Sequence, residues 1–316
     1  MHTEDSPLVS VIIVYYKRPE TIEAAIESAL QQDYPRREIL VIDNRSDDGL
    51  RELIERRGYD VRLIELPVNR GACGGRNAGI EAARGDIIVC SEDDVQFMSA
   101  FELTKVVNTF RERPDIGVLA FKIVDPKTGE LRLREWCHPR YWKEASDQEF
   151  ETDWFGEGAS AFRREVFERC GAYYAPFFYG AEGDDLVVRI FNGGYRILYT
   201  PRIRVGHAAS EAGRTSTRQY YFFTRNYVWT AFKNFAGFQR VKFIVPKLLM
   251  MLYFTLRSRS FGAFVRGLWH GVRGLAAVRQ ERAVATRETL RYMAELEKQR
   301  PTLLVRFARH KAAPQI

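Results

Sequence analysis

The stretch Asp86-Ile87-Ile88-Val89-Cys90-Ser91-Glu92-Asp93-Asp94 decides the fold. Its uncharged, mostly apolar core is typical of a buried parallel strand, which puts three carboxylates at the carboxyl end. Ligands of open α/β sheets bind at that edge. Clustered carboxylates repel one another unless a cation neutralises them, and oxygen ligands suit hard divalent ions. The stretch therefore predicts a Mg²⁺ or Mn²⁺ site, with a solvated acidic turn as the alternative.

Upstream of this stretch, strands and helices alternate. Residues 10–15, 38–42 and 61–66 are short apolar runs, and helical patterns separate them. Such alternation predicts right-handed βαβ units. We therefore expect an α/β fold of Rossmann-like type, a mostly parallel sheet flanked by helices.

Downstream the pattern changes. Residues 117–134 predict a hairpin around a Pro-Gly turn, and 155–162 a strand of small residues where a ligand or another backbone approaches closely. A helix is expected over 182–192 and a last strand over 196–200. From Thr217 the chain is expected to be helical.

The net charge of +7 hides an asymmetry along the chain. Residues 1–236 carry 32 Lys and Arg against 37 Asp and Glu, a net −5, and residues 237–316 carry 16 against 4, a net +12. This asymmetry indicates an anionic surface as partner. The four cysteines show no metal-ligand spacing, so reduced thiols are expected. The N-terminus is acidic and polar, so no signal peptide is expected.

The basic C-terminal quarter also contains many aromatic and aliphatic residues. Its longest strongly apolar run, Leu248–Leu256, has nine residues, whereas a spanning helix needs about 20. The mixture predicts helices that lie in a membrane interface. A core-packing helix with a solvated basic face and an oligomer contact are the alternatives, and nucleic acid is not an expected partner. We expect a cytoplasmic protein, peripheral on the inner face of the plasma membrane.

Three polar features follow successive strands and are expected to form one cleft: Asp43, the glycine-rich stretch 69–77 and the acidic residues 92–94. Asp43 could accept a hydrogen bond from a base or a ribose, although an Asp at this place is often only a turn cap. The glycines of 69–77 would let backbone amides approach a phosphate at a helix N-terminus.

These features together resemble family 2 glycosyltransferases of GT-A fold. The similar stretches are VSVIIVYYKRPE, VIDNRSDDG, NRGACGGRNAGI, IIVCSEDDV, GASAFRREVFERCGAYYAPFFYGAEGDDLVVRIFNGGYRILYTP and RNYVWTAFKNF. The resemblance implies a GT-A domain over 1–236 and a basic amphipathic helical extension over 237–316. It also implies inverting, metal-dependent transfer of a sugar from a nucleoside-diphosphate sugar. The acceptor would be a hydroxyl of a saccharide or lipid-linked molecule in cell-envelope or polysaccharide synthesis.

The resemblance also implies site residues. Donor binding would use Val14, Tyr16, Asp43, Asn69, Gly75, Arg76, Glu92 and Asp93, and Mn²⁺ or Mg²⁺ would bind Asp94 and His207. A capped surface histidine is the alternative for His207. Glu182-Gly183-Asp184-Asp185-Leu186 stands where the family usually has Glu-Asp-x-Asp-Leu. The family's second position, which often supplies the base, is Gly183 here, so the base stays open among Glu182, Asp184 and Asp185. Glu182 is favoured because a related subgroup keeps an acid there.

Two other functions compete with sugar transfer. A nucleotidyltransferase would be expected to have a glycine-rich, lysine-bearing loop after its first strand, and residues 15–19 contain no glycine. A membrane-associated module that binds nucleotide sugars without catalysis is the other, and Gly183 is the feature that favours it.

Overall fold

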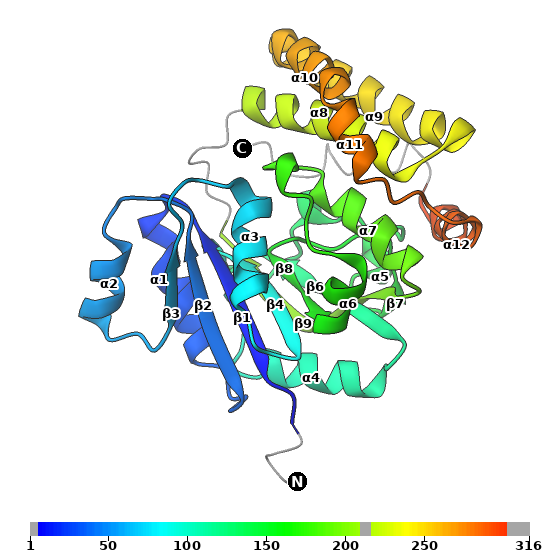
Figure 1. Cartoon of the computed structure of the whole chain (residues 1–316). Helices are drawn as coiled ribbons and strands as arrows, with labels where there is room; N and C mark the ends of the chain where they lie inside the picture. Colours follow the sequence, from blue (N-terminus) through cyan, green and yellow to red (C-terminus); the bar gives the residue numbers. More distant parts are fainter. Residues whose placement is uncertain (1–5, 209–215, 302–316) are drawn as a thin grey trace.

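The computed structural model describes residues 6–208 and 216–301, so residues 1–5 and the last fifteen of the predicted extension lie outside it. Within the described residues one mixed sheet has the order β3-β2-β1-β4-β8-β6-β9-β5, with β7 paired to β9 (Figure 1). The strands are β1 Val9–Tyr15, β2 Arg37–Asp43, β3 Arg62–Glu65, β4 Ile87–Glu92, β5 Val95–Phe97, β6 Ile116–Val124, β7 Phe150–Glu151, β8 Ala159–Arg163 and β9 Arg196–His207.

The sheet is parallel in its first half and mixed in its second. Among themselves, strands β1 to β4 pair only in parallel, as the βαβ pattern predicts. Strand β8 then pairs antiparallel with both β4 and β6, and β9 is parallel to β6 but antiparallel to β5 and β7. The predicted parallel arrangement therefore holds for the first half of the sheet, which carries the acidic end of β4.

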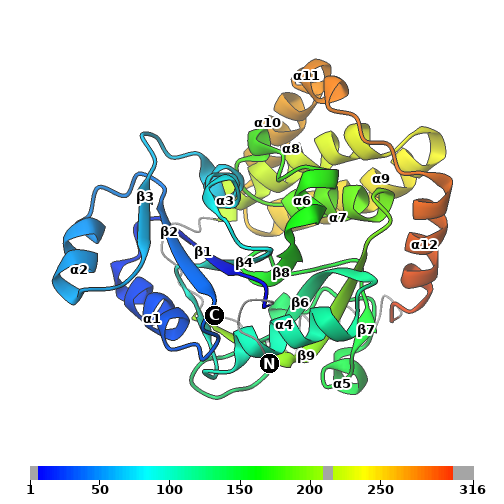
Figure 2. The same ribbon diagram turned by 60° about the horizontal axis from the view of Figure 1, so that its bottom comes forward.

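Helices cover both faces of the sheet. They are α1 Pro19–Leu30, α2 Leu50–Arg57, α3 Gly71–Ala82, α4 Glu102–Glu112, α5 Trp142–Ala145, α6 Arg164–Cys170, α7 Glu182–Asn192, α8 Ser216–Asn234, α9 Gly237–Arg257, α10 Phe261–Arg273, α11 Leu275–Gln280 and α12 Arg287–Lys298. Figure 2 shows α1 and α4 on one side and α3, α6 and α7 on the other. The sheet separates two hydrophobic cores, and strand β1 contributes side chains to both. Val11 and Ile13 belong to one core and Ile12 to the other, because successive side chains of a strand point to opposite faces.

Most of the glycine-rich stretch 69–77 is helical, and the predicted approach of a phosphate to the helix start stays a prediction. Helix α3 already begins at Gly71, so Gly74 and Gly75 lie inside it. A Cβ on Gly75 would lie 2.8 Å from Val14 Cγ1, and one on Gly79 would overlap Ile12. Gly75 and Gly79 therefore let α3 pack closely on β1.

Local boundaries differ from the sequence expectations in the second half. The expected hairpin has a turn at 125–130, but its second strand is reduced to a bridge between Val124 and Leu131. Strand β9 continues past Pro201 to His207 because its register with β6 shifts between Thr200 and Arg204. A bulge is where a strand tolerates proline.

The C-terminal helices form a second layer over the α3, α6 and α7 side (Figures 1 and 2). Helix α8 lies within the predicted GT-A domain, yet it packs against α10. A Cβ on Gly271 would lie 2.9 Å from Val228 Cβ, and Trp229 donates to the Gly271 carbonyl at 2.9 Å. The boundary at 236/237 stays a prediction. In the described part of the chain, no helix has both the length and the hydropathy needed to cross a bilayer.

Candidate active site

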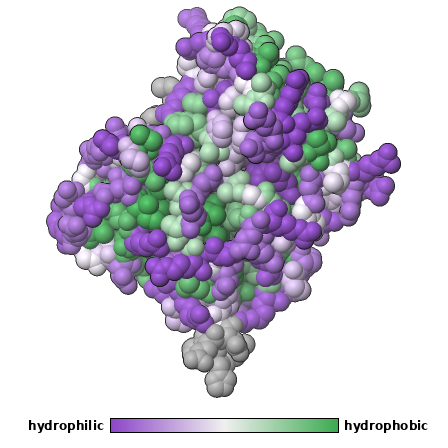
Figure 3. Space-filling view, viewed as in Figure 1, coloured by the Kyte–Doolittle hydropathy of each residue, from purple (hydrophilic) through white to green (hydrophobic). Residues whose placement is uncertain are grey.

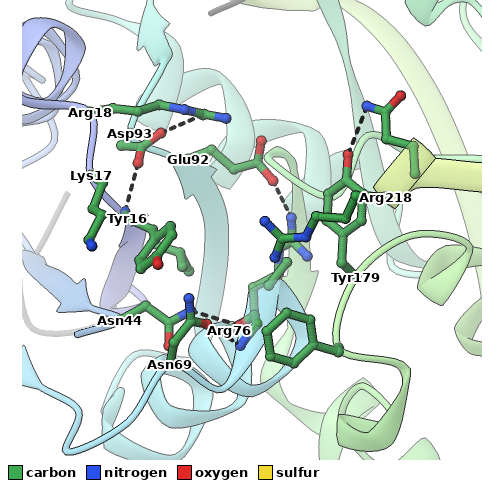
Figure 4. Close-up of a pocket in the computed structure, with 15 residues that line it drawn as sticks. Tyr16, Lys17, Arg18, Asn44, Asn69, Arg76, Glu92, Asp93, Tyr179 and Arg218 are labelled. Atoms are coloured by element: carbon green, nitrogen blue, oxygen red, sulfur yellow. Dashed lines mark hydrogen bonds and ion pairs between the residues drawn. The ribbon is translucent and has the colours of Figure 1, made fainter. Parts of the chain in front are cut away.

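A cavity of about 330 Å³ opens at the carboxyl ends of β1 and β4 (Figure 4). The parallel register pairs Tyr15 with Asp43 and Val14 with Glu92, so these strand ends lie at one edge. Helix α8 closes the opposite wall with Arg218 and Gln219. The residues predicted for donor binding that line the cavity are Val14, Tyr16, Asn69, Arg76, Glu92 and Asp93.

Two predicted donor residues lie outside the cavity wall. Asp43 is buried, and its carboxylate accepts the Ser46 N–H at 2.9 Å. That contact is the turn cap that the sequence allowed as the alternative. Gly75 packs on Val14 within the helix. Any effect of these two residues on the donor would therefore pass through the positions of their neighbours.

The acidic strand end is neutralised by a side chain that follows β1. Arg18 Nη1 lies 2.8 Å from Asp93 Oδ1 and 2.8 Å from Asp94 Oδ2. Asp93 also accepts the Tyr16 N–H at 2.9 Å. Burial nevertheless raises the pKa of Asp93 to about 7, although Arg18 and the Tyr16 N–H lower it. Sequence reasoning missed Arg18, although the basic pair at 17–18 directly follows a strand that ends in the cleft.

His207 reaches the same group of carboxylates from the end of β9. Its Nε2 lies 3.3 Å from Asp94 Oδ2, and its Nδ1 lies 2.8 Å from Glu135 Oε1. Burial lowers the pKa of His207, but the contacts with Asp94 and Glu135 outweigh burial and raise it to about 10. The imidazole thus lies between two carboxylates that favour its protonated form.

Glu92, Asp94 and His207 fit a divalent metal. One ligand atom from each lies within 4.8 Å of those of the other two. Two carboxylates and an imidazole form a donor set that suits ions such as Mn²⁺. Metal binding through His207 would require a lone pair on its ring nitrogen, and the metal would have to share the Asp94 carboxylate with Arg18 or displace it.

Arg76 links this group to the start of α7. It is 2% exposed and forms ion pairs with Glu92 and, at 3.0 Å, with Glu182 Oε1. The resemblance implied that Arg76 binds the donor. In the structure the charge of Arg76 is shared between two carboxylates, and Arg76 lines the cavity beside them.

The two aspartates of the 182–185 segment are held by the C-terminal helices. Asp185 is fully buried and contacts Arg189 at 2.7 Å and Lys233 of α8 at 2.8 Å. Asp184 is partly exposed and contacts Lys247 of α9 at 3.0 Å. Both aspartates are thus in ion pairs, as is Glu182.

Several cavity residues were not predicted from the sequence. Lys17 and Arg18 come from the end of β1, and Phe178, Tyr179, Arg218 and Gln219 come from the α7 approach and α8. Phe178 has a left-handed φ of +64°. Strained backbone of this kind often occurs at functional sites. No local pattern marks these residues, because distant segments bring them together.

Comparison with known proteins gives the family. The model of "Glycosyl transferase family 2" matches residues 10–171, just over half of the chain. The chain belongs to glycosyl transferase family 2. The match spans β1 to α6 and includes the acidic strand end.

Individual relatives are more distant. Poly-beta-1,6-N-acetyl-D-glucosamine synthase of Staphylococcus epidermidis is 27% identical over 134 residues, 40% of this chain and 29% of that protein. The Escherichia coli protein UDP-Glc:alpha-D-GlcNAc-diphosphoundecaprenol beta-1,3-glucosyltransferase WfaP is 36% identical over 103 residues, 32% of this chain and 39% of that protein. The chain thus spans well under half of these curated relatives.

A solved structure supports the fold over nearly the whole chain. The mannosyltransferase PcManGT of Pyrobaculum calidifontis, in complex with GDP-Man and Mn²⁺, has a TM-score of 0.57 and 20% identity. The alignment covers 96% of this chain and 84% of that one. Together with the family match, it confirms the predicted GT-A fold with a helical C-terminal part.

Proposed function

We propose that this chain transfers a sugar from a nucleoside-diphosphate sugar to a hydroxyl group, with inversion and with Mn²⁺ or Mg²⁺. The acceptor is a saccharide or lipid-linked molecule of cell-envelope or polysaccharide synthesis. The observation that carries the proposal is the cavity at the strand ends, with Glu92, Asp94 and His207 at its edge.

The cavity wall suits a nucleotide diphosphate. Lys17, Arg18 and Arg218 line it and supply positive charge for phosphate oxygens. Tyr16 and Phe178 offer aromatic faces beside these cations. The relatives support this donor class, since WfaP is named for UDP-Glc and the solved mannosyltransferase holds GDP-Man.

The metal would be held by Asp94 and His207, with Glu92 beside them. When bound, it would supply positive charge for the departing diphosphate. Arg18, which contacts Asp94, also lines the cavity wall, where it can pair with a phosphate.

The reaction also needs a carboxylate near the acceptor. The start of α7 offers Glu182, Asp184 and Asp185. A carboxylate on this segment or packed beside it takes the acceptor proton while the acceptor oxygen attacks the anomeric carbon. The donor's bond to the diphosphate breaks, and the nucleoside diphosphate departs with the electron pair.

Membrane attachment is the second part of the proposal. Helices α9 and α10 expose large apolar side chains along one side of each helix: Phe238, Val241, Val245, Leu249, Leu256, Phe261, Val265, Trp269 and Val272. Figure 3 shows apolar surface over the part of the molecule where Figure 1 places these helices. With the net +12 of 237–316, this surface favours the anionic inner face of a plasma membrane.

The test uses the full chain and a panel of UDP-, dTDP- and GDP-sugars with Mn²⁺. At least one donor is expected to raise the melting temperature and to release nucleoside diphosphate, and EDTA is expected to abolish release. Asp94→Ala should abolish the Mn²⁺-dependent release of nucleoside diphosphate. Asp115→Ala, a control at an exposed residue far from the cavity, should leave that release unchanged. Binding without release would favour the catalytically inactive module. Full release in excess EDTA would refute the metal assignment, and absence of any binding would refute the donor site.

A further inference from the structure

The space beside Gly183 is filled by a carboxylate from another segment. A Cβ on Gly183 would lie 2.6 Å from Glu157 Oε1, and the Gly183 N–H donates to the same oxygen at 3.2 Å. Gly183 has no left-handed φ, so its backbone would accept a side chain. The Glu157 carboxylate therefore lies where a side chain at 183 would begin.

The loop that carries Glu157 approaches the site closely because glycines flank that residue. A Cβ on Gly158 would lie 2.6 Å from Glu92 Cγ, and one on Gly156 would lie 2.9 Å from Ile123 Cδ1. Glu157 is thereby held between the end of β4 and the start of α7. The sequence predicted a close approach over 155–162 but did not identify the acid that it positions.

Glu157 also differs from its neighbours in its partners. Glu182, Asp184 and Asp185 are each in ion pairs with Arg or Lys. Within residues 6–208 and 216–301, Glu157 forms no ion pair, and part of the residue reaches solvent. It can therefore accept a proton without first breaking an ion pair.

The surroundings of Glu157 suit proton transfer. Burial, and after it the charge of Glu182, raise the pKa of Glu157 to about 8, although Arg76 lowers it. General bases work best when their pKa lies near the working pH. The charges that face this carboxylate come from α3, β4 and α7.

We infer that Glu157 is the general base of this chain and replaces the side chain that Gly183 lacks. The inference rests on the proposed function. Glu157 takes the proton of the acceptor hydroxyl, and the acceptor oxygen forms the new bond to the anomeric carbon. The bond from that carbon to the diphosphate oxygen breaks, and its electron pair leaves with the nucleoside diphosphate. Glu182 then acts as a positioning residue through Arg76.

The experiment measures nucleoside diphosphate release from UDP-glucose and GDP-mannose with Mn²⁺, with water as the acceptor. Glu157→Gln is expected to lower kcat by about 10²–10⁴-fold. The Kd for UDP or GDP, measured by calorimetry, should stay within about twofold. Glu168→Gln, an exposed glutamate on α6, is the matched control and should change neither quantity.

Moving the carboxylate from position 157 to position 183 distinguishes a catalytic role of Glu157 from a packing role. Glu157→Ala should be as inactive as Glu157→Gln, and adding Gly183→Asp to it should restore kcat at least tenfold. Gly183→Asp alone should lose activity, because its Cβ would crowd Glu157.

Two results would overturn the inference. They are a Glu157→Gln variant within threefold of the wild-type kcat, and a double variant no more active than Glu157→Ala. If the wild type released nothing from any donor of the full panel, the proposed function would fail, and the inference with it.

Discussion

Asp185→Asn tests whether this aspartate stabilises the fold or takes part in catalysis. Its carboxylate is fully buried between Arg189 and Lys233, at 2.7 and 2.8 Å. The amide keeps the shape but removes the negative charge, which leaves two buried cations together. Arg189 retains hydrogen bonds to the carbonyls of Cys170 and Gly171, whereas Lys233 loses an ion pair.

Removing one member of a buried ion pair costs about 3–5 kcal/mol. Domains of roughly this size lose about 2–4 °C of melting temperature per kcal/mol, so the expected fall is about 6–20 °C. Asp184→Asn is the matched control. Its pair with Lys247 is partly exposed, so a fall of no more than a few degrees is expected.

The pH dependence has a definite sign. Burial raises the pKa of Asp185, but Arg189 and Lys233 outweigh burial and lower it below its ordinary value. Its contribution is therefore present above about pH 3.9 and is lost as the pH falls through the lowered pKa. The melting-temperature difference between wild type and Asp185→Asn should be constant from pH 6 to 8 and shrink below pH 4.

Scanning calorimetry of the full chain, with donor release measured in parallel, decides the matter. Adding Lys233→Met to Asp185→Asn should recover part of the lost stability, because the unpaired lysine charge is gone. A variant that melts within 2 °C of the wild type but no longer turns over would refute this reasoning and make Asp185 catalytic.

Three further perturbations test other parts of the molecule. Gly79→Ala should destabilise the fold by about 1–3 kcal/mol through overpacking on β1, whereas Gly262→Ala, which faces open space, should not; urea unfolding measures both. Burial lowers the pKa of His138 well below 6.5, so its contribution is lost as the pH falls below that value. A melting-temperature scan from pH 7 to 5 should therefore be flatter for His138→Phe. The double variant Leu249→Ser, Trp269→Ser should float less with anionic vesicles in 0.1 M salt than the wild type does. Raising the salt to 1 M should weaken the flotation of the wild type as well. A wild type that dimerises and never floats would make that surface an oligomer contact.

The N-terminal half of the sheet was predictable because its signals are local. The apolar run before Glu92 and the earlier strand patterns give β1, β2 and β4 within about a residue. Strand β5 and strand β7 have three and two residues, which is too short for a periodic pattern. The β8 pairing, which makes the second half mixed, depends on contacts with β4 and β6 that lie far away along the chain.

The sequence predicted where the candidate site lies, but not the contacts between its side chains. Carboxylates at a strand end predicted the acidic edge, but no spacing rule indicated that Arg18 would bridge Asp93 and Asp94. Glycine has several uses: 74 and 75 were expected in a loop, but both lie inside α3, and Gly75 packs on Val14 of β1. Glu157 and Gly183 are 26 residues apart, and only the folded chain brings them together.

Hydrogen bonds from α8 to the turn before α7 have a consequence for protein engineering. Arg225 donates to the carbonyls of Pro176 and Phe177, and Asn226 donates to those of Phe177, Tyr179 and Gly180. The same turn supplies Phe178 and Tyr179 to the cavity. A chimera that exchanges the C-terminal helices for those of another family member would therefore also reshape this cavity. If the proposed function holds, changes in membrane attachment and in donor choice would be inherited together unless the crossover point lies after Asn226.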